Sequence, residues 1–182
     1  VRSIEITPNL DGELVQVKVD ASDAAKMRVV VRDGDTTIAE ETGRTDAAVS
    51  LSLPDAKRWS PDAPHLYDLD VELEGEDRVT SYFGMRKVEI RKDGNGVNRI
   101  FLNDEPLFQF GPLDQGWWPD GLYTPAPDEA MKYDIVMTKK FGMNMARKHV
   151  KYECARWYYW CDKLGLLVWQ DMPAGDTGRN DE

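Results

Sequence analysis

The segment Phe141–Pro173 restricts the fold most, because it reads as a helix end, a strand, a second helix and a second strand. Gly142 and Gly165 each stand where a helix is expected to end in a left-handed cap, which glycine adopts without steric cost. An apolar run follows each glycine and then gives way to polar residues. Buried parallel strands are continuous apolar runs, and α/β folds keep functional groups at their carboxyl ends. The segment therefore predicts successive strand–helix units with functional side chains at the strand ends.

In residues 3 to about 91 the pattern is different: apolar and polar residues alternate with a period of two. This period is typical of half-buried antiparallel strands. Clusters of Gly, Pro, Asn and Asp separate the alternating runs, as expected for turns. About seven short strands in about 90 residues fit an immunoglobulin-like β-sandwich. The residues expected to face its core are Val15, Val17, Val19, Met27, Val29, Val31, Val49, Leu51, Leu53, Tyr67, Leu69, Val71 and Leu73.

The polar, glycine-rich segment 92–96 is the expected boundary between two domains, 1–91 and 92–182. The composition changes after it, since Trp59 is the only one of the six tryptophans that precedes it. The chain is therefore predicted to combine a β domain with an α/β domain.

Beyond this boundary we expect a small hairpin over residues 100–108, a strand over 107–111, a long loop, and then alternating helices and strands. The helices are expected over residues 127–142 and 154–164. This order implies a parallel sheet. A sheet of three parallel strands needs cover on both faces and at one edge, whereas a (β/α)₈ barrel takes about 250 residues. The second domain is therefore predicted to be the truncated N-terminal part of such a barrel.

The chain carries a net charge of −10 over 182 residues, with a pI of about 4.7. Phosphate recognition needs clustered Lys and Arg, so we expect neither nucleic acid nor an anionic membrane surface as a partner. No apolar run approaches the roughly 18 residues that span a bilayer. The two cysteines, Cys154 and Cys161, are expected on one helix, too far apart for a disulfide, and therefore as free thiols. Two cysteines are too few for a zinc framework, and no cofactor is expected.

Five segments of the chain together resemble one known family. Residues 59–67 (WSPDAPHLY) and 83–86 (FGMR) are similar to its immunoglobulin-like middle domain, and residues 101–107 (FLNDEPL) to the hairpin that enters its catalytic barrel. Residues 144–149 (NMARKH) resemble its second barrel strand, and residues 157–171 resemble the next helix and third strand. The family is glycoside hydrolase family 2, which contains β-galactosidases, β-glucuronidases and β-mannosidases.

The resemblance implies a retaining exo-acting β-glycosidase, whose two catalytic carboxyl groups lie about 5–5.5 Å apart. In this family both are glutamates, at the ends of the fourth and seventh barrel strands, and the acid/base follows an asparagine. The sequence has no Asn-Glu dipeptide, and the tail Asn180-Asp181-Glu182 follows the third strand too closely. The chain alone is therefore expected to be inactive. Its implied partners are a β-linked carbohydrate and the remainder of the same polypeptide.

Two other interpretations stay open. One is a non-catalytic module, in which the β-sandwich binds carbohydrate or serves as a subunit interface. The other is a complete small enzyme of another class, which is weaker because the sequence has no nucleophile–base arrangement, no metal cluster and no phosphate loop before a helix. These features determine neither the compartment nor whether the chain assembles into a homo-oligomer.

Three polar side chains at the predicted strand ends are candidate substrate-binding residues. Arg147 matches the family's active-site arginine, and a guanidinium there can keep a nearby carboxylate ionised. His149 can hydrogen-bond a sugar hydroxyl through a neutral ring nitrogen. Asp171 can accept hydrogen bonds from sugar hydroxyls or hold Arg147. For each residue the alternative is a purely structural ion pair or loop contact.

The loop after the first predicted barrel strand supplies four further candidates. Asp114 and Gln115 can hydrogen-bond sugar hydroxyls, and the rings of Trp117 and Trp118 can pack on the apolar faces of sugar rings. Two adjacent tryptophans are difficult to bury together, so at least one is expected to be exposed. Many family members carry Gly-x-Asn-x-His where this chain has Gly111-Pro112-Leu113-Asp114-Gln115, which departs from the family's usual substrate contact in this loop.

Three neighbouring features are interpreted as structural. Lys148 should point to the opposite side of its strand from Arg147 and His149. Glu153 lies near a helix start, where an acidic residue favours the helix dipole. The aromatic run 157–160 is expected to pack its helix against the sheet.

Overall fold

The structure is a computed structural model that describes residues 1–75, 77–124 and 127–173. The tail Asn180-Asp181-Glu182, which was considered for its acidic residues, lies outside the described residues. Within the described ranges, no helix is both long enough and apolar enough to cross a membrane.

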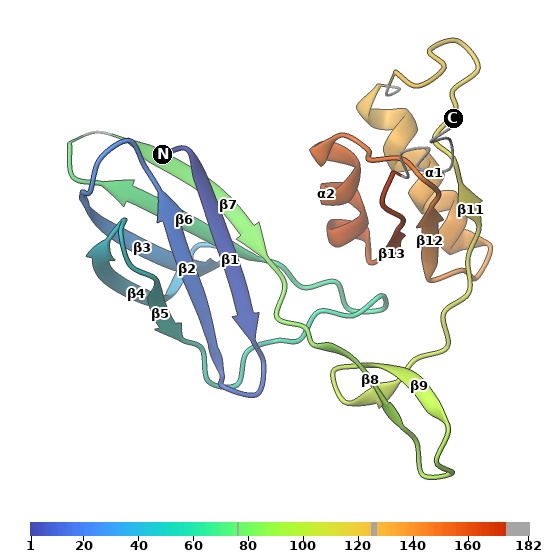
Figure 1. Cartoon of the computed structure of the whole chain (residues 1–182), viewed down its shortest axis with the longest axis horizontal. Helices are drawn as coiled ribbons and strands as arrows, with labels where there is room; N and C mark the ends of the chain where they lie inside the picture. The colour runs from blue at the N-terminus through green and yellow to red at the C-terminus, as the bar shows by residue number, and fades with distance from the viewer. Residues whose placement is uncertain (76, 125–126, 174–182) are drawn as a thin grey trace, which may run out of the picture. The chain divides into compact units, whose positions relative to one another are not determined.

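The chain divides into two compact units, Val1–Leu107 and Phe108–Glu182, each of which is described by itself. Two antiparallel sheets form most of the first unit (Figure 1). One has the strand order β1-β2-β5, and the other has the order β4-β3-β6-β7. Their strands are β1 (Ser3–Asn9), β2 (Leu14–Asp20), β3 (Lys26–Asp33), β4 (Thr36–Arg44), β5 (Val49–Ser52), β6 (Tyr67–Leu73) and β7 (Arg78–Phe83).

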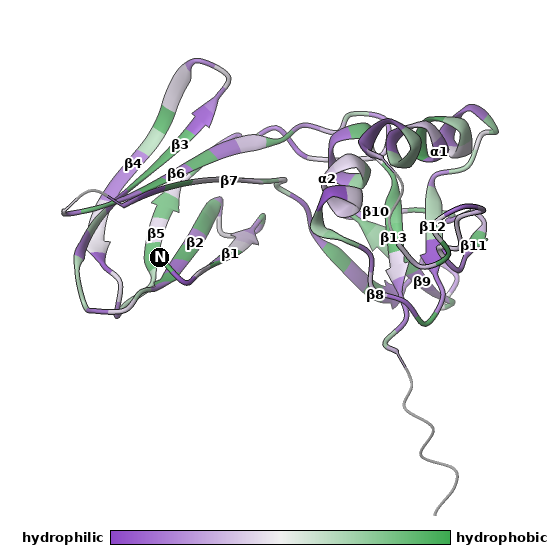
Figure 2. Ribbon diagram, turned by 90° about the horizontal axis from the view of Figure 1, so that it is seen from above, coloured by the Kyte–Doolittle hydropathy of each residue, from purple (hydrophilic) through white to green (hydrophobic). Residues whose placement is uncertain are grey.

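The core of the first unit is made of alternate side chains from both sheets. Along β2, Val15 and Val17 are completely buried, whereas Gln16 between them is exposed. Figure 2 shows the same alternation of hydrophobic and hydrophilic residues along the strands. Each fully buried apolar side chain contributes about 1.5–3 kcal/mol, so this alternation fixes which face of each strand turns inward. The predicted β-sandwich and its core-facing residues are confirmed, although Val49 and Leu73 are only half-buried.

A third, small antiparallel sheet follows within the first unit. The hairpin predicted over residues 100–108 is confirmed, as the pairing of β9 with β10. The glycine-rich segment 92–96 spans the turn between β8 and β9, so the boundary expected there falls inside this sheet. The three strands are β8 (Val88–Lys92), β9 (Asn98–Leu102) and β10 (Glu105–Pro106).

The second unit alternates strands and helices, in the order that the sequence predicts. Its three strands are parallel neighbours in the order β11-β12-β13, and one helix connects each strand to the next. Gly142 and Gly165 both have positive φ angles, +80° and +78°, as expected for residues that end helices. The elements are β11 (Leu113–Asp114), α1 (Asp128–Lys140), β12 (Met145–Lys148), α2 (Ala155–Leu164) and β13 (Leu167–Gln170).

The first strand of this unit differs from the prediction. A strand was expected over residues 107–111, but the pairing with β12 begins at Leu113. Gly111 lies so close to β12 that a Cβ atom there would overlap the carbonyl oxygen of Met145, and Pro112 has no N–H to donate. Gly111 therefore already contacts β12, but regular pairing between the two segments begins only at Leu113.

Both helices pack on one face of the parallel sheet. Their buried residues Met131, Ile135 and Trp157 form one apolar cluster with Ala146 of β12 and the half-buried Val168 of β13. Successive side chains of a strand point to opposite faces. Arg147 and Trp169 therefore point away from the helices.

Candidate functional site

The centre of the candidate site is an ion pair at the carboxyl end of the parallel sheet. Arg147 Nη2 and Nε donate hydrogen bonds of 2.9 and 3.1 Å to the two carboxylate oxygens of Asp171. Arg147 lies in β12, and Asp171 follows the last residue of β13. The backbone N–H of Asp171 donates to Lys148 O, which holds the two strand ends together. The structure thus brings together two residues that are 24 positions apart in the sequence.

Each partner of this pair stabilises the charged form of the other. The hydrogen bonds from Arg147 lower the pKa of Asp171, and the hydrogen bonds to Asp171 raise the pKa of Arg147. The nearby His149 ring and the backbone N–H of Val150 lower the pKa of Asp171 further. The Arg147 side chain is 46% exposed, so the pair is accessible to a polar ligand.

His149 and Gln115 form a second polar contact on the same side of the sheet. Gln115 Nε2 lies 3.0 Å from His149 Nδ1, and the backbone N–H of His149 donates to Asp114 O. His149 is two residues beyond Arg147 on the chain, so both side chains lie on the face without helices. This face carries four of the seven predicted site residues, which we call the polar cluster: Arg147, Asp171, His149 and Gln115.

Asp114 lies on the opposite, helix-covered face. Its Oδ2 atom is 2.5 Å from Lys148 Nζ, and its Oδ1 atom accepts the backbone N–H of Gly116. The two residues Asp114 and Gln115 were expected to bind hydroxyls as a pair, but as strand neighbours they point to opposite faces. Both carboxylate oxygens of Asp114 are engaged within the protein, which gives this residue a structural role.

Lys148 occupies the centre of a buried network of charges. Its side chain is 1% exposed, lies 4.3 Å from the centroid of the Trp157 ring, and is 3.0 Å from Glu153 Oε1. Glu153 is also 3.0 Å from Lys151 Nζ. With Asp114, these residues make a set of two cations and two anions, as buried charges require. The structural interpretation of Lys148 and Glu153 is consistent with this network.

The two adjacent tryptophans have different environments. Trp117 is 54% exposed, and its ring centroid is 4.2 Å from that of Tyr123. Trp118 is half-buried and packs against the apolar cluster of the helices. Of these two tryptophans, Trp117 alone has a largely exposed ring.

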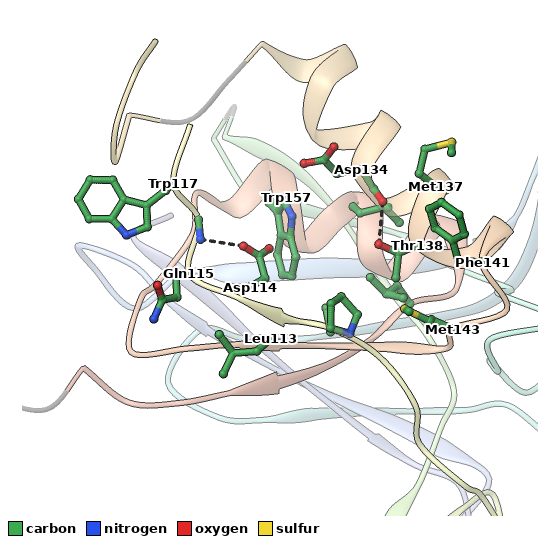
Figure 3. Close-up of a pocket in the computed structure, with 15 residues that line it drawn as sticks. Leu113, Asp114, Gln115, Trp117, Asp134, Met137, Thr138, Phe141, Met143 and Trp157 are labelled. Atoms are coloured by element: carbon green, nitrogen blue, oxygen red, sulfur yellow. Dashed lines mark hydrogen bonds between the residues drawn. The ribbon is translucent and has the colours of Figure 1, made fainter. Parts of the chain in front are cut away.

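A cavity of about 590 Å³ lies beside α1 on the helix-covered face (Figure 3). Its polar lining includes Asp114, Gln115, Asp134 and Thr138, and Trp117 lines it as well. Arg147, His149 and Asp171 do not line this cavity. Gln115 does line it, so the cavity adjoins the polar cluster at this residue. Within the described residues, no group of three or more His, Cys, Asp or Glu side chains is placed to hold a metal ion.

Comparisons with known proteins identify the family of the chain. The sequence profile of Glycosyl hydrolases family 2 matches residues 1–86. A β-galactosidase from Leuconostoc mesenteroides is 35% identical over 138 residues, and one from Thermoanaerobacter pseudethanolicus is 28% identical over 96% of this chain. The chain belongs to glycosyl hydrolase family 2. A probable β-mannosidase from Caenorhabditis elegans is 30% identical over 71% of this chain.

Two solved β-glucuronidase structures share the fold along the whole chain. A β-glucuronidase from Ruminococcus gnavus superimposes on all of it with a TM-score of 0.85 at 22% sequence identity. A β-glucuronidase from Dictyoglomus thermophilum does so with a TM-score of 0.82 at 20% identity. The chain covers 31% of each of these structures, and 13% and 23% of the two β-galactosidases named above. At 20% and 22% identity, the two β-glucuronidases show a likeness of fold alone.

Several residues of this family 2 chain have roles that the sequence analysis missed. Lys151 is buried and donates hydrogen bonds to Gly116 O and Tyr123 O. Gln170 accepts a hydrogen bond from the Tyr158 hydroxyl and donates to Lys151 O and Asp171 O. The sequence carries no local signal for the burial of Lys151, since its partners Gly116 and Tyr123 are distant along the chain.

Proposed function

We propose that this chain contributes an immunoglobulin-like sandwich and the first strands of a catalytic (β/α)₈ barrel to a retaining β-glycosidase. In this proposal residues 1–91 form the sandwich, and residues 92–182 contribute the entry hairpin and the first three barrel strands. The observation that carries the proposal is the Arg147–Asp171 pair at the carboxyl end of parallel strands, in a chain that belongs to a glycosidase family.

The parallel sheet supports the barrel part of this proposal. Helices α1 and α2 cover one face, and the other face carries Arg147 and the 45%-exposed Trp169. Leu113, also on this face by its register with Arg147, is 53% exposed. A barrel covers one face of its strands with helices and fills the other with side chains from neighbouring strands. Further strands beside β11 and β13 would pair both of these edges.

The polar cluster supplies the groups that a sugar ring needs. Asp171 accepts hydrogen bonds from hydroxyls, Arg147 donates them, and the His149–Gln115 contact can do both. In a retaining mechanism one carboxylate attacks the sugar while a second carboxyl group protonates the leaving oxygen. Arg147 beside the attacking carboxylate would keep it ionised at neutral pH. The sequence has no Asn-Glu dipeptide, so both catalytic glutamates are assigned to other parts of the polypeptide.

The test compares the 182-residue chain with its complete native reading frame on a panel of aryl β-galactosides, β-glucuronides and β-mannosides. The complete protein is expected to hydrolyse at least one of them, and the chain alone none. Arg147→Ala in the complete protein should lower kcat/KM on the order of 10–100-fold, since a hydrogen bond to a charged group is worth about 1.5–3 kcal/mol.

Arg156→Ala is the matched control, because Arg156 is 61% exposed on α2 and its ion pair with Asp128 is long, at 3.7 Å. It should keep wild-type activity. Full activity in the Arg147→Ala protein would remove this residue from the site. A complete protein without activity on any glycoside would instead favour a non-catalytic carbohydrate-binding or interface module.

A further inference from the structure

The loop after β11 contains a small hairpin that presents apolar side chains to solvent. Trp118 and Leu122 exchange two backbone hydrogen bonds of 2.9 Å, one in each direction. Trp117, Leu122 and Tyr123 are 54%, 63% and 47% exposed. We call residues 116–123 the aromatic hairpin. Its exposed surface is apolar and lies next to Gln115, the last member of the polar cluster along this strand.

A single buried ammonium group holds both ends of the aromatic hairpin. Lys151 Nζ donates a hydrogen bond of 2.7 Å to Gly116 O and one of 3.4 Å to Tyr123 O. Its charge is balanced by Glu153, whose side chain is 3% exposed. Gly116 has a φ of +66°, and a Cβ atom there would lie 2.6 Å from Lys151 Nζ. The hairpin is thus fixed before any ligand arrives, which lowers the entropic cost of binding.

One strained residue, Val150, lies between Lys151 and His149 of the polar cluster. Val150 has a φ of +47°, a left-handed conformation that β-branched residues rarely adopt. The next residue is Lys151, whose carbonyl oxygen accepts a hydrogen bond from Nε2 of Gln170, the residue before Asp171. Strained backbone persists where its surroundings hold it, and it is concentrated at ligand sites. The turn therefore sets the positions of Asp171 and the aromatic hairpin together.

The aromatic pair suits a ring that has an apolar face. Trp117 and Tyr123 are inclined by 54°, and Lys151 Nζ lies 4.8 Å from the Tyr123 ring centroid. The pair offers the indole N–H and the phenol O–H as its only side-chain polar groups, whereas the neighbouring cluster offers a guanidinium, a carboxylate, an imidazole and an amide. A ligand with one hydroxyl-rich ring and a second ring attached to it would match both surfaces.

We infer that the aromatic hairpin is a subsite for the second ring of a β-glycoside, which is the ring linked to the sugar held by the polar cluster. Trp117 and Tyr123 contact this ring, and Lys151 is a positioning residue. This inference rests on the proposed function and adds a preference to it. Glycosides that carry an aryl group or a second sugar bind better than methyl glycosides of the same sugar.

The direct test is a two-dimensional ¹⁵N NMR titration of the 182-residue chain. The indole signal of Trp117 is assigned by its loss in Trp117→Phe, and the side-chain Nε–H signal of Arg147 by its loss in Arg147→Lys. The probes are phenyl and methyl β-glycosides of galactose, glucuronic acid and mannose, together with lactose as a β-linked disaccharide. Phenyl glycosides or the disaccharide should shift both signals, and methyl glycosides should shift the Arg147 signal alone.

The outcomes separate the two proposals. An Arg147 signal that responds while Trp117 stays unchanged with every probe overturns the subsite but supports the proposed sugar site. A Trp117 shift of the same size with methyl and phenyl glycosides also overturns the subsite. A Trp117 shift with phenyl glycosides and none at Arg147 supports the aromatic subsite and contradicts the sugar site. No shift at either signal overturns both.

A second measurement uses the complete protein and does not depend on binding by the shorter chain. Trp117→Ala should lower kcat/KM for phenyl glycosides about tenfold more than for methyl glycosides, chiefly through KM. Lys151→Met should also lower the ratio of kcat/KM for phenyl glycosides to kcat/KM for methyl glycosides. It should broaden the Trp117 indole signal, because the aromatic hairpin loses the hydrogen bonds from Lys151. Lys163→Met, at an exposed lysine of α2, is the control and should change neither. If Lys151→Met does not fold, Tyr123→Ala replaces it, and an unchanged ratio in that variant and in Trp117→Ala overturns the inference.

Discussion

Lys148 Nζ lies 3.0 Å from Glu153 Oε1, and the two side chains are only 1% and 3% exposed. This ion pair is therefore almost completely removed from water. Breaking a buried pair by removing one partner leaves an uncompensated charge, which typically costs about 3–5 kcal/mol.

Glu153→Gln should accordingly lower the free energy of unfolding of the second unit by about 3 kcal/mol, because it leaves both Lys148 and Lys151 without this carboxylate. Tryptophan fluorescence during urea unfolding measures this, since five of the six tryptophans lie in that unit. Glu129→Gln, at an exposed position of α1, is the control and should stay within about 0.5 kcal/mol of wild type. Equal stabilities of the two variants would contradict the role of the network.

The Arg147–Asp171 pair predicts a dependence of stability on pH. The pKa of Asp171 is lowered in the folded state, so its contribution is complete above the ordinary carboxylate pKa of about 4 and is lost as the pH falls through the lowered value. The wild type should be more stable than Asp171→Asn at pH 7, and the difference should shrink toward pH 3. Urea midpoints at both pH values measure this. Asp120→Asn, at an exposed loop position, should show no such difference; a constant gap for Asp171→Asn would count against the ion pair.

The close approach of Gly111 to β12 predicts a severe effect of one added methyl group. In Gly111→Ala the Cβ atom would overlap Met145 O, so one of the two backbone segments must move. Overpacking of this kind costs about 1–3 kcal/mol. Gly94→Ala is the control, because no atom lies within 4 Å of a Cβ built there. Thermal unfolding followed by circular dichroism should show a lower midpoint for the first variant and an unchanged one for the second.

The left-handed Val150 predicts a substitution that stabilises the protein. A non-glycine residue in such a conformation costs about 1–3 kcal/mol, whereas glycine adds about 0.5–1 kcal/mol of unfolded-state entropy. Val150→Gly should therefore raise the free energy of unfolding by about 1 kcal/mol. Val136→Gly, in helix α1, should lower it by a similar amount. Urea unfolding of both variants is the measurement, and a loss of stability in Val150→Gly would mean that the conformation is not strained.

Repeating patterns made the architecture predictable from the sequence. The period-two runs identify the buried side of β2 and β3 because each apolar residue is supported by neighbours two positions away. Gly142 and Gly165 mark the helix ends because few other residues take positive φ there. In both cases the signal is local, and tertiary packing reinforces it.

The details of the site were less predictable because they depend on register. Asp114 and Gln115 differ by one position, and a shift of one residue exchanges the two faces of a strand. The burial of Lys151 is a tertiary effect as well, since its partners Gly116 and Tyr123 lie 35 and 28 residues away. The sequence alone gives no reason to remove a lysine from water.

The balance of charge among Asp114, Lys148, Lys151 and Glu153 has an evolutionary consequence. The set is neutral as a whole. Any single change of charge therefore leaves one uncompensated charge beneath the aromatic hairpin. Related proteins should therefore keep all four residues or replace them in a coordinated way, for instance an acid and a base together by apolar side chains. In an alignment these positions should covary, even though they are dispersed over 40 residues of sequence.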